Sequence, residues 1–206
     1  PAGFNKNAFV AGYGMAETTL AVSFSQLGQG LIPDSVDRDH LANFQMAIPV
    51  NPATDGMRGR VKTFVSCGEQ LPGYDVQVRN DYGRVLPERQ VGRLFVRGPS
   101  VMRGYFNDDE ATQETLSEDG WFETGDLAYR NANSIIITGR AKDLIIINGR
   151  NVWPQDLENI AEQQPEVRTG DASAFSLPGA NGTDRAVLLV QCRDPEKARA
   201  SELAVN

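Results

Sequence analysis

The sequence predicts a protein of mixed α/β and α+β class, in which a small antiparallel sheet or barrel precedes a smaller α+β unit. Short runs rich in β-branched and aromatic residues follow one another at 61–66, 74–79 and 93–98. From about residue 143 onward, the pattern changes between strand and helix in the order β-α-β-β. The chain has 206 residues, of which 40% are hydrophobic, and this is enough for a sizeable core.

The first part of the chain supplies the predicted sheet. Residues 1–24 hold a short apolar segment, AFVAGYG, followed by MAETTLAVSF. Residues 25–60 carry scattered Gly, Pro and Asp and are expected to form loops. Three predicted strands follow at 61–66, 74–79 and 93–98, and the turn signal NDYG comes directly after the second. Because these strands are close in sequence, we expect them to pair antiparallel.

The next segments predict an acidic helix and a hairpin. Residues 107–120, NDDEATQETLSEDG, are typical of a short acidic surface helix. GWFETGDLAYR then leads to two isoleucine-rich strands, SIIITGR and LIIING. The turn between these strands contains Lys142, one of only four lysines in the chain. We therefore expect a hairpin with Lys142 at its tip, although RAKD is unusual for such a turn.

An amphipathic helix is predicted after the hairpin, in WPQDLENIAEQQPEV. Pro154 suits the first helical position because the N–H that it lacks would be unpaired there. Helical spacing predicts one apolar face, formed by Leu157, Ile160 and Ala161. Pro165 is expected to end the helix. DASAFSL and AVLLVQCR then predict two strands, and another helix is expected to begin in DPEKARASELAVN, so this small unit looks incomplete.

Composition excludes several classes of function. The net charge of −7 argues against general nucleic-acid binding, which needs clustered Lys and Arg. No apolar run approaches the roughly 20 residues of a membrane span, and the N-terminus has no signal-peptide pattern. Cys67 and Cys192 lie far apart without CxxC spacing, which favours reduced thiols and a cytoplasmic location. The single His40 makes a Ser-His-Asp nucleophile improbable.

The first chemically unusual segment is GYGMAE, at 12–17. An aromatic ring between two glycines can lie open to a flat partner, since its neighbours have no side chains to cover it. Glu17 could reach a hard cation, because Mg²⁺ is often held by one or two carboxylates together with substrate phosphates. The alternative is a turn that enters a helix, with Glu17 solvated. A dinucleotide-binding loop would need a third glycine where Glu17 stands.

Three further segments also allow a structural or a functional interpretation. GRLFVRGPSVMRGYF reads mostly as a structural strand and turn. In GWFETGDLAYR, Asp126 could accept hydrogen bonds from vicinal hydroxyls, or it could form an Asx turn after Gly125. The third segment, TGRAKDLIIINGRNVWPQDLE at 138–158, contains a basic trio whose alternative role is to protect a sheet edge from pairing. The trio consists of Arg140, Lys142 and Arg150.

Together and in this order, the four segments resemble the core motifs of the adenylate-forming superfamily, which includes acyl-CoA synthetases, luciferases and peptide-synthetase adenylation domains. The resemblance runs from about residue 9 to 165. A narrower resemblance is to the fatty-acyl-AMP ligases. It rests on YGMAETTLAVSF, VSCGEQLPGYDVQV and RNVWPQDLE, and on an extra stretch at about 28–51 in the position of the insertion typical of these ligases.

The resemblance implies an enzyme that uses ATP and Mg²⁺ to convert a fatty acid to its acyl-adenylate with release of pyrophosphate. The acyl group would then pass to the phosphopantetheine thiol of an acyl carrier protein. The alternatives are a ligase that uses CoA as acceptor, and a non-catalytic member of the superfamily that serves as a binding module. The insertion at 28–51 favours the carrier protein, because it is thought to restrain the domain motion that transfer to CoA needs.

The resemblance also implies roles for individual residues. Tyr13 is similar to the aromatic residue that stacks on adenine, and Glu17 to the Mg²⁺ carboxylate. Asp126 is similar to the acid that holds the ribose hydroxyls, and Arg140 to a basic partner near the ribose and phosphates. The neighbours of Tyr13 along the nucleotide and acyl pocket would be Gly12, Gly14, Met15 and Ala16.

Lys142 matches the superfamily's hinge position, which implies a catalytic role in domain motion. Residues 1–141 would form the end of a large N-terminal domain with a small distorted β-barrel, and residues 142–206 the hinge and part of a small C-terminal lid domain. The superfamily's phosphate loop is absent, and so is its C-terminal catalytic lysine, since no Gly-Lys pair occurs in the chain. We therefore expect this chain to be part of a longer enzyme and inactive alone.

Overall fold

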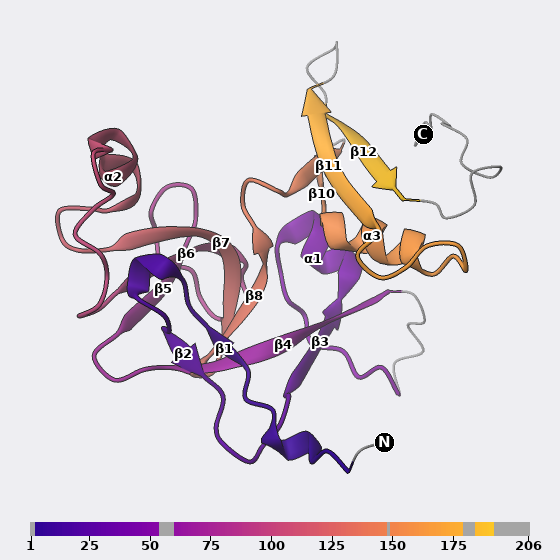
Figure 1. The fold of residues 1–206 in the computed structure, drawn as a ribbon, viewed down its shortest axis with the longest axis horizontal. Coiled ribbons are helices and arrows are strands. Elements are labelled where there is room, and N and C mark those ends of the chain that lie inside the picture. Colours follow the sequence, from indigo (N-terminus) through magenta and orange to yellow (C-terminus); the bar gives the residue numbers. More distant parts are fainter. Residues whose placement is uncertain (1–2, 54–59, 148, 179–183, 192–206) are drawn as a thin grey trace. The chain divides into compact units, whose positions relative to one another are not determined.

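The computed structural model describes residues 3–53, 60–147, 149–178 and 184–191. The chain forms two compact units, Pro1–Lys142 and Asp143–Asn206 (Figure 1). Each unit has sheets and helices of its own.

Unit 1 is built on an eight-stranded sheet in which neighbouring strands are antiparallel. The strand order is β1-β2-β4-β8-β7-β6-β5, and β3 also pairs with β4. In Figure 1, β7 runs across the unit below α2 and then turns down beside β8, while β4 runs below them, so the sheet is strongly bent. The strands are β1 Gly12–Tyr13, β2 Ser23–Phe24, β3 Pro33–Asp37, β4 Val61–Gln70, β5 Asp75–Arg79, β6 Gly92–Arg97, β7 Phe122–Asn131 and β8 Ser134–Arg140.

The main hydrophobic cluster of unit 1 lies on one face of this sheet, while Tyr129 and Ile136 are completely buried on the other face. In β5 and β6, alternate residues point inward, and Val78, Leu94 and Val96 are almost completely buried. This period of two is why the strands predicted at 61–66, 74–79 and 93–98 are confirmed. The predicted acidic helix is also confirmed as α2, Asp109–Thr115, which Asp108 caps through the Ala111 N–H at 3.0 Å.

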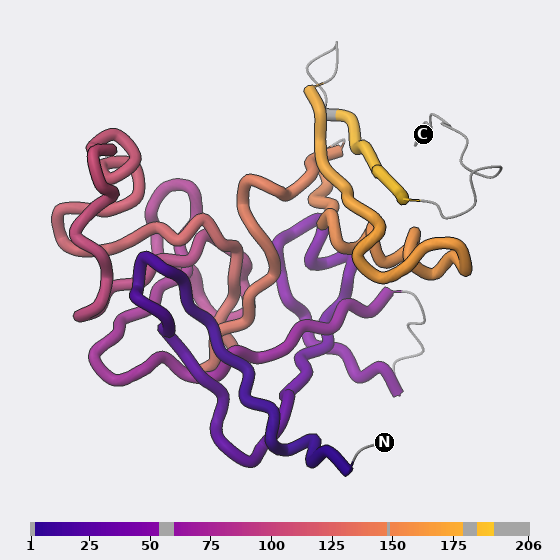
Figure 2. Tube along the Cα trace, viewed as in Figure 1, coloured from indigo at the N-terminus to yellow at the C-terminus, as the bar shows by residue number. Residues whose placement is uncertain are grey.

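The prediction that residues 25–60 form loops is only partly correct. They contain β3 and the helix α1, Arg38–Phe44, with Leu41 completely buried. Asp37 caps α1 by accepting hydrogen bonds from the N–H groups of Asp39 and His40 at 2.8 and 2.9 Å. Figure 2 shows this segment folding back onto the strand that begins at Val61, with which β3 pairs. The sequence of β3, PDSVD, has no apolar alternation, so its pairing with β4 decides its structure.

The predicted hairpin around Lys142 is also wrong. SIIITGR forms β8, which pairs with β7 and β4 in unit 1. The LIIING run supplies β9, Ile145–Ile147, which pairs with β10, Arg150–Val152, in unit 2. GWFETGDLAYR, which was expected only to lead into the hairpin, is mostly strand β7. Hydrophobic periodicity identifies strands but does not identify their partners, and here the two runs belong to different sheets.

Unit 2 follows the predicted β-α-β-β order, with β10 as an additional short strand. Its helix α3, Pro154–Glu162, has Pro154 in its first turn and ends before Pro165, as predicted. The predicted apolar face is only partly correct, because Ala161 is buried while Ile160 is 53% exposed. Strands β11, Ala172–Pro178, and β12, Asp184–Val190, confirm the last two predicted strands. The helix expected in DPEKARASELAVN lies outside the described residues.

Candidate functional site

Three of the predicted site residues meet at Asp126, in strand β7. Its Oδ2 atom accepts a hydrogen bond from the Tyr13 hydroxyl at 2.5 Å. Its Oδ1 atom lies 3.0 Å from Nε of Arg140, which is the cross-strand partner of Asp126 on β8. Asp126 is buried, with 8% of its surface exposed, whereas the Arg140 side chain is 53% exposed. The carboxylate is therefore held at both oxygens, on one side by a phenol and on the other by a solvent-facing cation.

Asp126 does not lie in a turn, as the Asx-turn interpretation would require. It belongs to β7, at a place where the ladder to β8 is irregular, with a register shift between Leu127 and Ala128. Gly125 has φ 76°, and the Asp126 N–H donates to Thr124 Oγ1 at 3.1 Å. An irregular strand can re-aim a side chain without leaving the sheet, and this places the carboxylate opposite Tyr13.

Tyr13 lies in β1, where its ring packs against the core cluster of unit 1. Burial raises the pKa of its hydroxyl, and the hydrogen bond to Asp126 adds to this effect. The phenol therefore stays protonated at neutral pH and donates to the carboxylate. The ring is half-buried, so it is less open than its position between two glycines suggested.

The neighbours of Tyr13 are constrained by close backbone approach. A Cβ on Gly14 would lie 1.8 Å from the Leu20 carbonyl oxygen, so no larger residue fits there without movement of the backbone. A Cβ on Gly12 would lie 2.6 Å from the Phe24 ring. Both glycines are exposed, as is Ala16, whereas Met15 packs against the core cluster.

Glu17 lies in the 3₁₀ helix η2, Ala16–Thr18. Its Oε1 atom accepts a hydrogen bond from the Tyr105 hydroxyl at 3.0 Å, and its carbonyl oxygen accepts the Met102 N–H at 2.7 Å. Sequence reasoning missed Tyr105, because GRLFVRGPSVMRGYF was interpreted mostly as structural. The available signal was a tyrosine beside Gly104 in a segment already noted for its composition.

The charge of Arg140, which pairs with Asp126, also acts on the Tyr105 hydroxyl that contacts Glu17. The pKa of the Tyr105 hydroxyl is raised, first by burial and then by its hydrogen bond to Glu17, while the charge of Arg140 acts in the opposite direction. Lys142 is exposed in the turn after β8 and is the last residue of unit 1. In the described part of the chain, no hydrogen bond or ion pair joins Lys142 to Glu17 or Asp126.

The ligand chemistry of Glu17 fits a hard cation that accompanies a phosphorylated substrate. Among the described residues, no group of three or more His, Cys, Asp or Glu side chains could enclose a metal ion. Mg²⁺ takes oxygen ligands and commonly keeps several waters and substrate phosphate oxygens beside one or two carboxylates. A single half-buried glutamate therefore suits a cation that arrives with its nucleotide.

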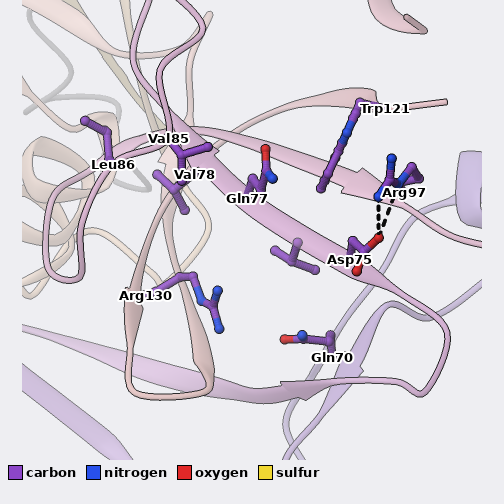
Figure 3. A pocket seen from close by; sticks show the side chains of 10 residues that line it. Gln70, Asp75, Gln77, Val78, Val85, Leu86, Arg97, Trp121 and Arg130 are labelled. Atoms are coloured by element: carbon purple, nitrogen blue, oxygen red, sulfur yellow. Dashed lines mark hydrogen bonds and ion pairs between the residues drawn. The ribbon is translucent and has the colours of Figure 1, made fainter. Parts of the chain in front are cut away.

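A separate cavity of about 360 Å³ lies among β4, β5, β6 and β7. Figure 3 shows Asp75 and Arg97, an ion pair at 2.7 Å, on one side of the cavity and Arg130 on the other. Gln70 Oε1 and Arg130 Nε are buried without a hydrogen-bond partner in the described residues. None of the predicted site residues lines this cavity. It is therefore distinct from the Tyr13–Asp126 cluster, and a water molecule could bridge its two polar atoms.

A family profile and the sequences of known proteins indicate the same family for this chain. The sequence profile of the AMP-binding enzymes matches residues 2–106. A Caulobacter vibrioides protein with the provisional name acyl-CoA synthetase is 48% identical over 94% of this chain and 33% of its own length. The medium-chain fatty acid–acyl carrier protein ligase JamA of Moorena producens is 33% identical over 100% of this chain and 35% of its own length. The chain thus spans about a third of these relatives.

Solved structures agree with this result. A structure from a study of fatty acyl-adenylate ligases of E. coli and L. pneumophila matches with a TM-score of 0.82 and 44% identity, over 94% of this chain and 34% of that one. A structure of ATP-bound MatB from Rhodopseudomonas palustris matches with a TM-score of 0.60 and 26% identity, over 88% of this chain and 30% of that one. In the described part of this chain, no helix is long and apolar enough to cross a membrane.

Proposed function

The chain belongs to the AMP-binding enzyme family, and from this premise we propose that it carries the nucleotide site of a ligase that activates a fatty acid with ATP. The observation that supports the proposal most directly is the Asp126 carboxylate, held between the Tyr13 hydroxyl and Arg140. These groups offer a ring face for a base, a carboxylate for a diol and a cation for phosphate. ATP presents all three partners.

Each group would have one task. The Tyr13 ring stacks on adenine, while Gly12, Gly14, Met15 and Ala16 form the adjoining wall of the nucleotide and acyl pocket. Asp126 accepts hydrogen bonds from the ribose hydroxyls, so Tyr13 must share or release Oδ2 when the nucleotide binds. Arg140 keeps its Nε on Asp126 Oδ1, and its half-exposed guanidinium offers its other N–H groups to the ribose and phosphates.

The reaction needs charge stabilisation more than side-chain acid–base chemistry. A carboxylate oxygen of the fatty acid attacks the α-phosphorus and forms a new P–O bond. The bond between the α-phosphorus and the oxygen that bridges to the β-phosphorus breaks, and this oxygen leaves with pyrophosphate. Arg140 stabilises the negative charge that builds on the α-phosphate. Glu17 would hold Mg²⁺, which would supply further charge neutralisation at the phosphates when bound.

We propose an acyl carrier protein as the acceptor of the acyl group. The carrier-protein ligase among the relatives supports this choice, as does the way the 28–51 stretch is attached. Asp34 in this stretch accepts a hydrogen bond from the buried Tyr129 hydroxyl at 2.6 Å and pairs with Arg89 at 3.1 Å. A stretch fixed to the sheet in this way is suited to restrain a moving domain. The acyl-CoA synthetase name of another relative keeps CoA as the rival acceptor.

The test uses the full-length protein that contains this chain, with ATP, Mg²⁺ and a labelled medium-chain fatty acid. Products are resolved by chromatography with and without CoA. We expect acyl-adenylate that persists when CoA is present. Conversion to acyl-CoA would overturn the choice of acceptor but leave the adenylation step intact, whereas the absence of any adenylate would overturn the proposed function.

A further inference from the structure

The connection between β6 and α2 holds Glu17 by both its backbone and its side chain. The Met102 N–H donates to the Glu17 carbonyl oxygen at 2.7 Å, and the Tyr105 hydroxyl donates to Glu17 Oε1 at 3.0 Å. One residue further on, the Ser100 hydroxyl donates to the Thr18 carbonyl oxygen at 2.7 Å. Two segments that are far apart in sequence are thus joined by hydrogen bonds at Glu17 and Thr18, one of which holds the Glu17 carboxylate.

Tyr105 is itself anchored to the start of α2. Its backbone N–H donates to Thr112 Oγ1 at 2.8 Å, and the Thr112 hydroxyl donates to the Asp108 carbonyl oxygen at 2.8 Å. The side chain of Asp108 caps α2. The hydroxyl of Tyr105 therefore approaches Glu17 from a fixed base, as a group that supports a metal ligand should.

The Tyr105 hydroxyl leaves room for a cation at Glu17. It donates a single hydrogen bond, to Glu17 Oε1 at 3.0 Å, and contributes no charge of its own. A carboxylate has about four lone-pair sites, so the remaining ones stay available to a cation.

We propose that Tyr105 is a positioning residue for Glu17: its hydroxyl fixes the orientation of the carboxylate, so that Glu17 is oriented to bind the nucleotide-associated cation. The inference rests on the proposed function, because it takes Glu17 as the cation ligand. It adds a residue that the sequence motifs did not identify. Removing a hydrogen bond to a metal ligand typically lowers metal affinity about 10- to 100-fold.

The experiment measures cation binding directly in the full-length protein. Mn²⁺ is titrated into protein saturated with α,β-methylene-ATP, and free Mn²⁺ is followed by electron paramagnetic resonance. Tyr105→Phe should raise the Kd for Mn²⁺ about 10-fold or more, while the Kd for the nucleotide without a divalent cation stays unchanged. The matched control is Tyr82→Phe, which removes a hydroxyl from a tyrosine that is 89% exposed and should leave both constants unchanged.

A double-mutant cycle separates positioning from a general structural effect. If Tyr105 acts through Glu17, Tyr105→Phe should have little effect on the Mn²⁺ Kd in a Glu17→Gln background. An equal loss in both backgrounds, or an unchanged Kd in Tyr105→Phe, would overturn the inference. If Tyr105→Phe lowers the melting temperature, Thr112→Val provides a second route. It keeps the phenol but removes its anchor, and an unchanged Mn²⁺ Kd there would also count against positioning.

Failure of the inference can be distinguished from failure of the proposed function. If the unmodified protein forms acyl-adenylate and binds Mn²⁺ with the nucleotide, the proposed function stands, whatever Tyr105→Phe does. If the unmodified protein shows neither property, Glu17 is not a cation ligand and both proposals fall together.

Discussion

Replacing Tyr13 by Phe tests the arrangement at Asp126 most sharply, because it removes one hydroxyl and leaves the aromatic ring. In the structure, this hydroxyl donates to Asp126 Oδ2 at 2.5 Å. The proposed function assigns the same carboxylate to the ribose hydroxyls. If the ribose displaces the phenol, the Tyr13–Asp126 hydrogen bond is a cost of nucleotide binding, and Tyr13→Phe should bind ATP more tightly.

The size of the effect follows from the kind of hydrogen bond. A hydrogen bond to a charged group contributes about 1.5–3 kcal/mol, and about 1.4 kcal/mol corresponds to a tenfold change in Kd. Full displacement would thus lower the Kd for ATP by about 10- to 100-fold. The lower end is the expected result, because Arg140 still holds Oδ1 and the new ribose contacts do not depend on the phenol. The ring's stacking contribution should remain.

Isothermal titration of ATP into the full-length protein measures this Kd, with Tyr13→Leu as the comparison. Tyr13→Leu also frees Asp126 but loses base stacking, which is worth about 1–3 kcal/mol. We therefore expect Phe to bind ATP more tightly than both Tyr and Leu at this position. Weaker binding by Tyr13→Phe than by the unmodified protein would refute the displacement argument. The hydroxyl would then contribute to the bound state, with Asp126 accepting from Tyr13 and the ribose together.

The other predictions concern the hinge, the α1 cap and the attachment of the 28–51 stretch. Lys142→Pro should slow at least one half-reaction in rapid-quench assays while leaving the Kd for ATP nearly unchanged, since a hinge must absorb a backbone rotation. A loss of ATP affinity as large as the loss of rate would argue against the hinge. Asp37→Ala should lower the free energy of unfolding by about 1 kcal/mol in urea at neutral pH, through loss of the cap. The N–H groups of His40 and Asp39 hold the pKa of Asp37 below its ordinary value, so this stabilisation is present above that value and is lost as pH falls through the lower folded-state pKa. A difference between the variants that persists undiminished at strongly acidic pH would contradict this. Asp34→Ala should lower the free energy of unfolding by about 3 kcal/mol, since it leaves Tyr129 and Arg89 without their shared carboxylate. A melting temperature within about 1 °C of that of the unmodified protein would show that this network contributes little.

The parts of the fold that the sequence predicted well are those with a strong local signal. The alternation in DVQVR and the proline at the start of α3 depend only on neighbouring residues, and both were interpreted correctly. Strand β3 depends instead on the backbone of β4, which it pairs with along five residues. The partner of β8 likewise depends on segments elsewhere in the chain. Pairing between distant segments cannot be predicted from a stretch of about ten residues alone.

The candidate site shows the same division. The motifs identified Tyr13, Asp126 and Arg140 separately, and the structure brings them together across strands β1, β7 and β8. Sequence reasoning could not find that Tyr13 and Asp126 are hydrogen-bonded to each other, because 113 residues separate them. Nor could it find Tyr105, whose importance comes only from its approach to Glu17 over a separation of 88 residues. The nucleotide roles of these residues remain predictions until binding is measured.

The position of Lys142 explains why the hinge and the nucleotide site can be tested independently. Tyr13, Glu17, Asp126 and Arg140 all belong to unit 1, which ends at Lys142. Arg140 is tied into the β7–β8 ladder through its pairing with Asp126, so the ladder ends two residues before the boundary between the units. A rotation at Lys142 would therefore leave every contact within the Asp126 cluster unchanged while unit 2 moves. The hinge proposal therefore requires that Lys142→Pro bind ATP as tightly as the unmodified protein. This requirement would not apply if Arg140 belonged to unit 2.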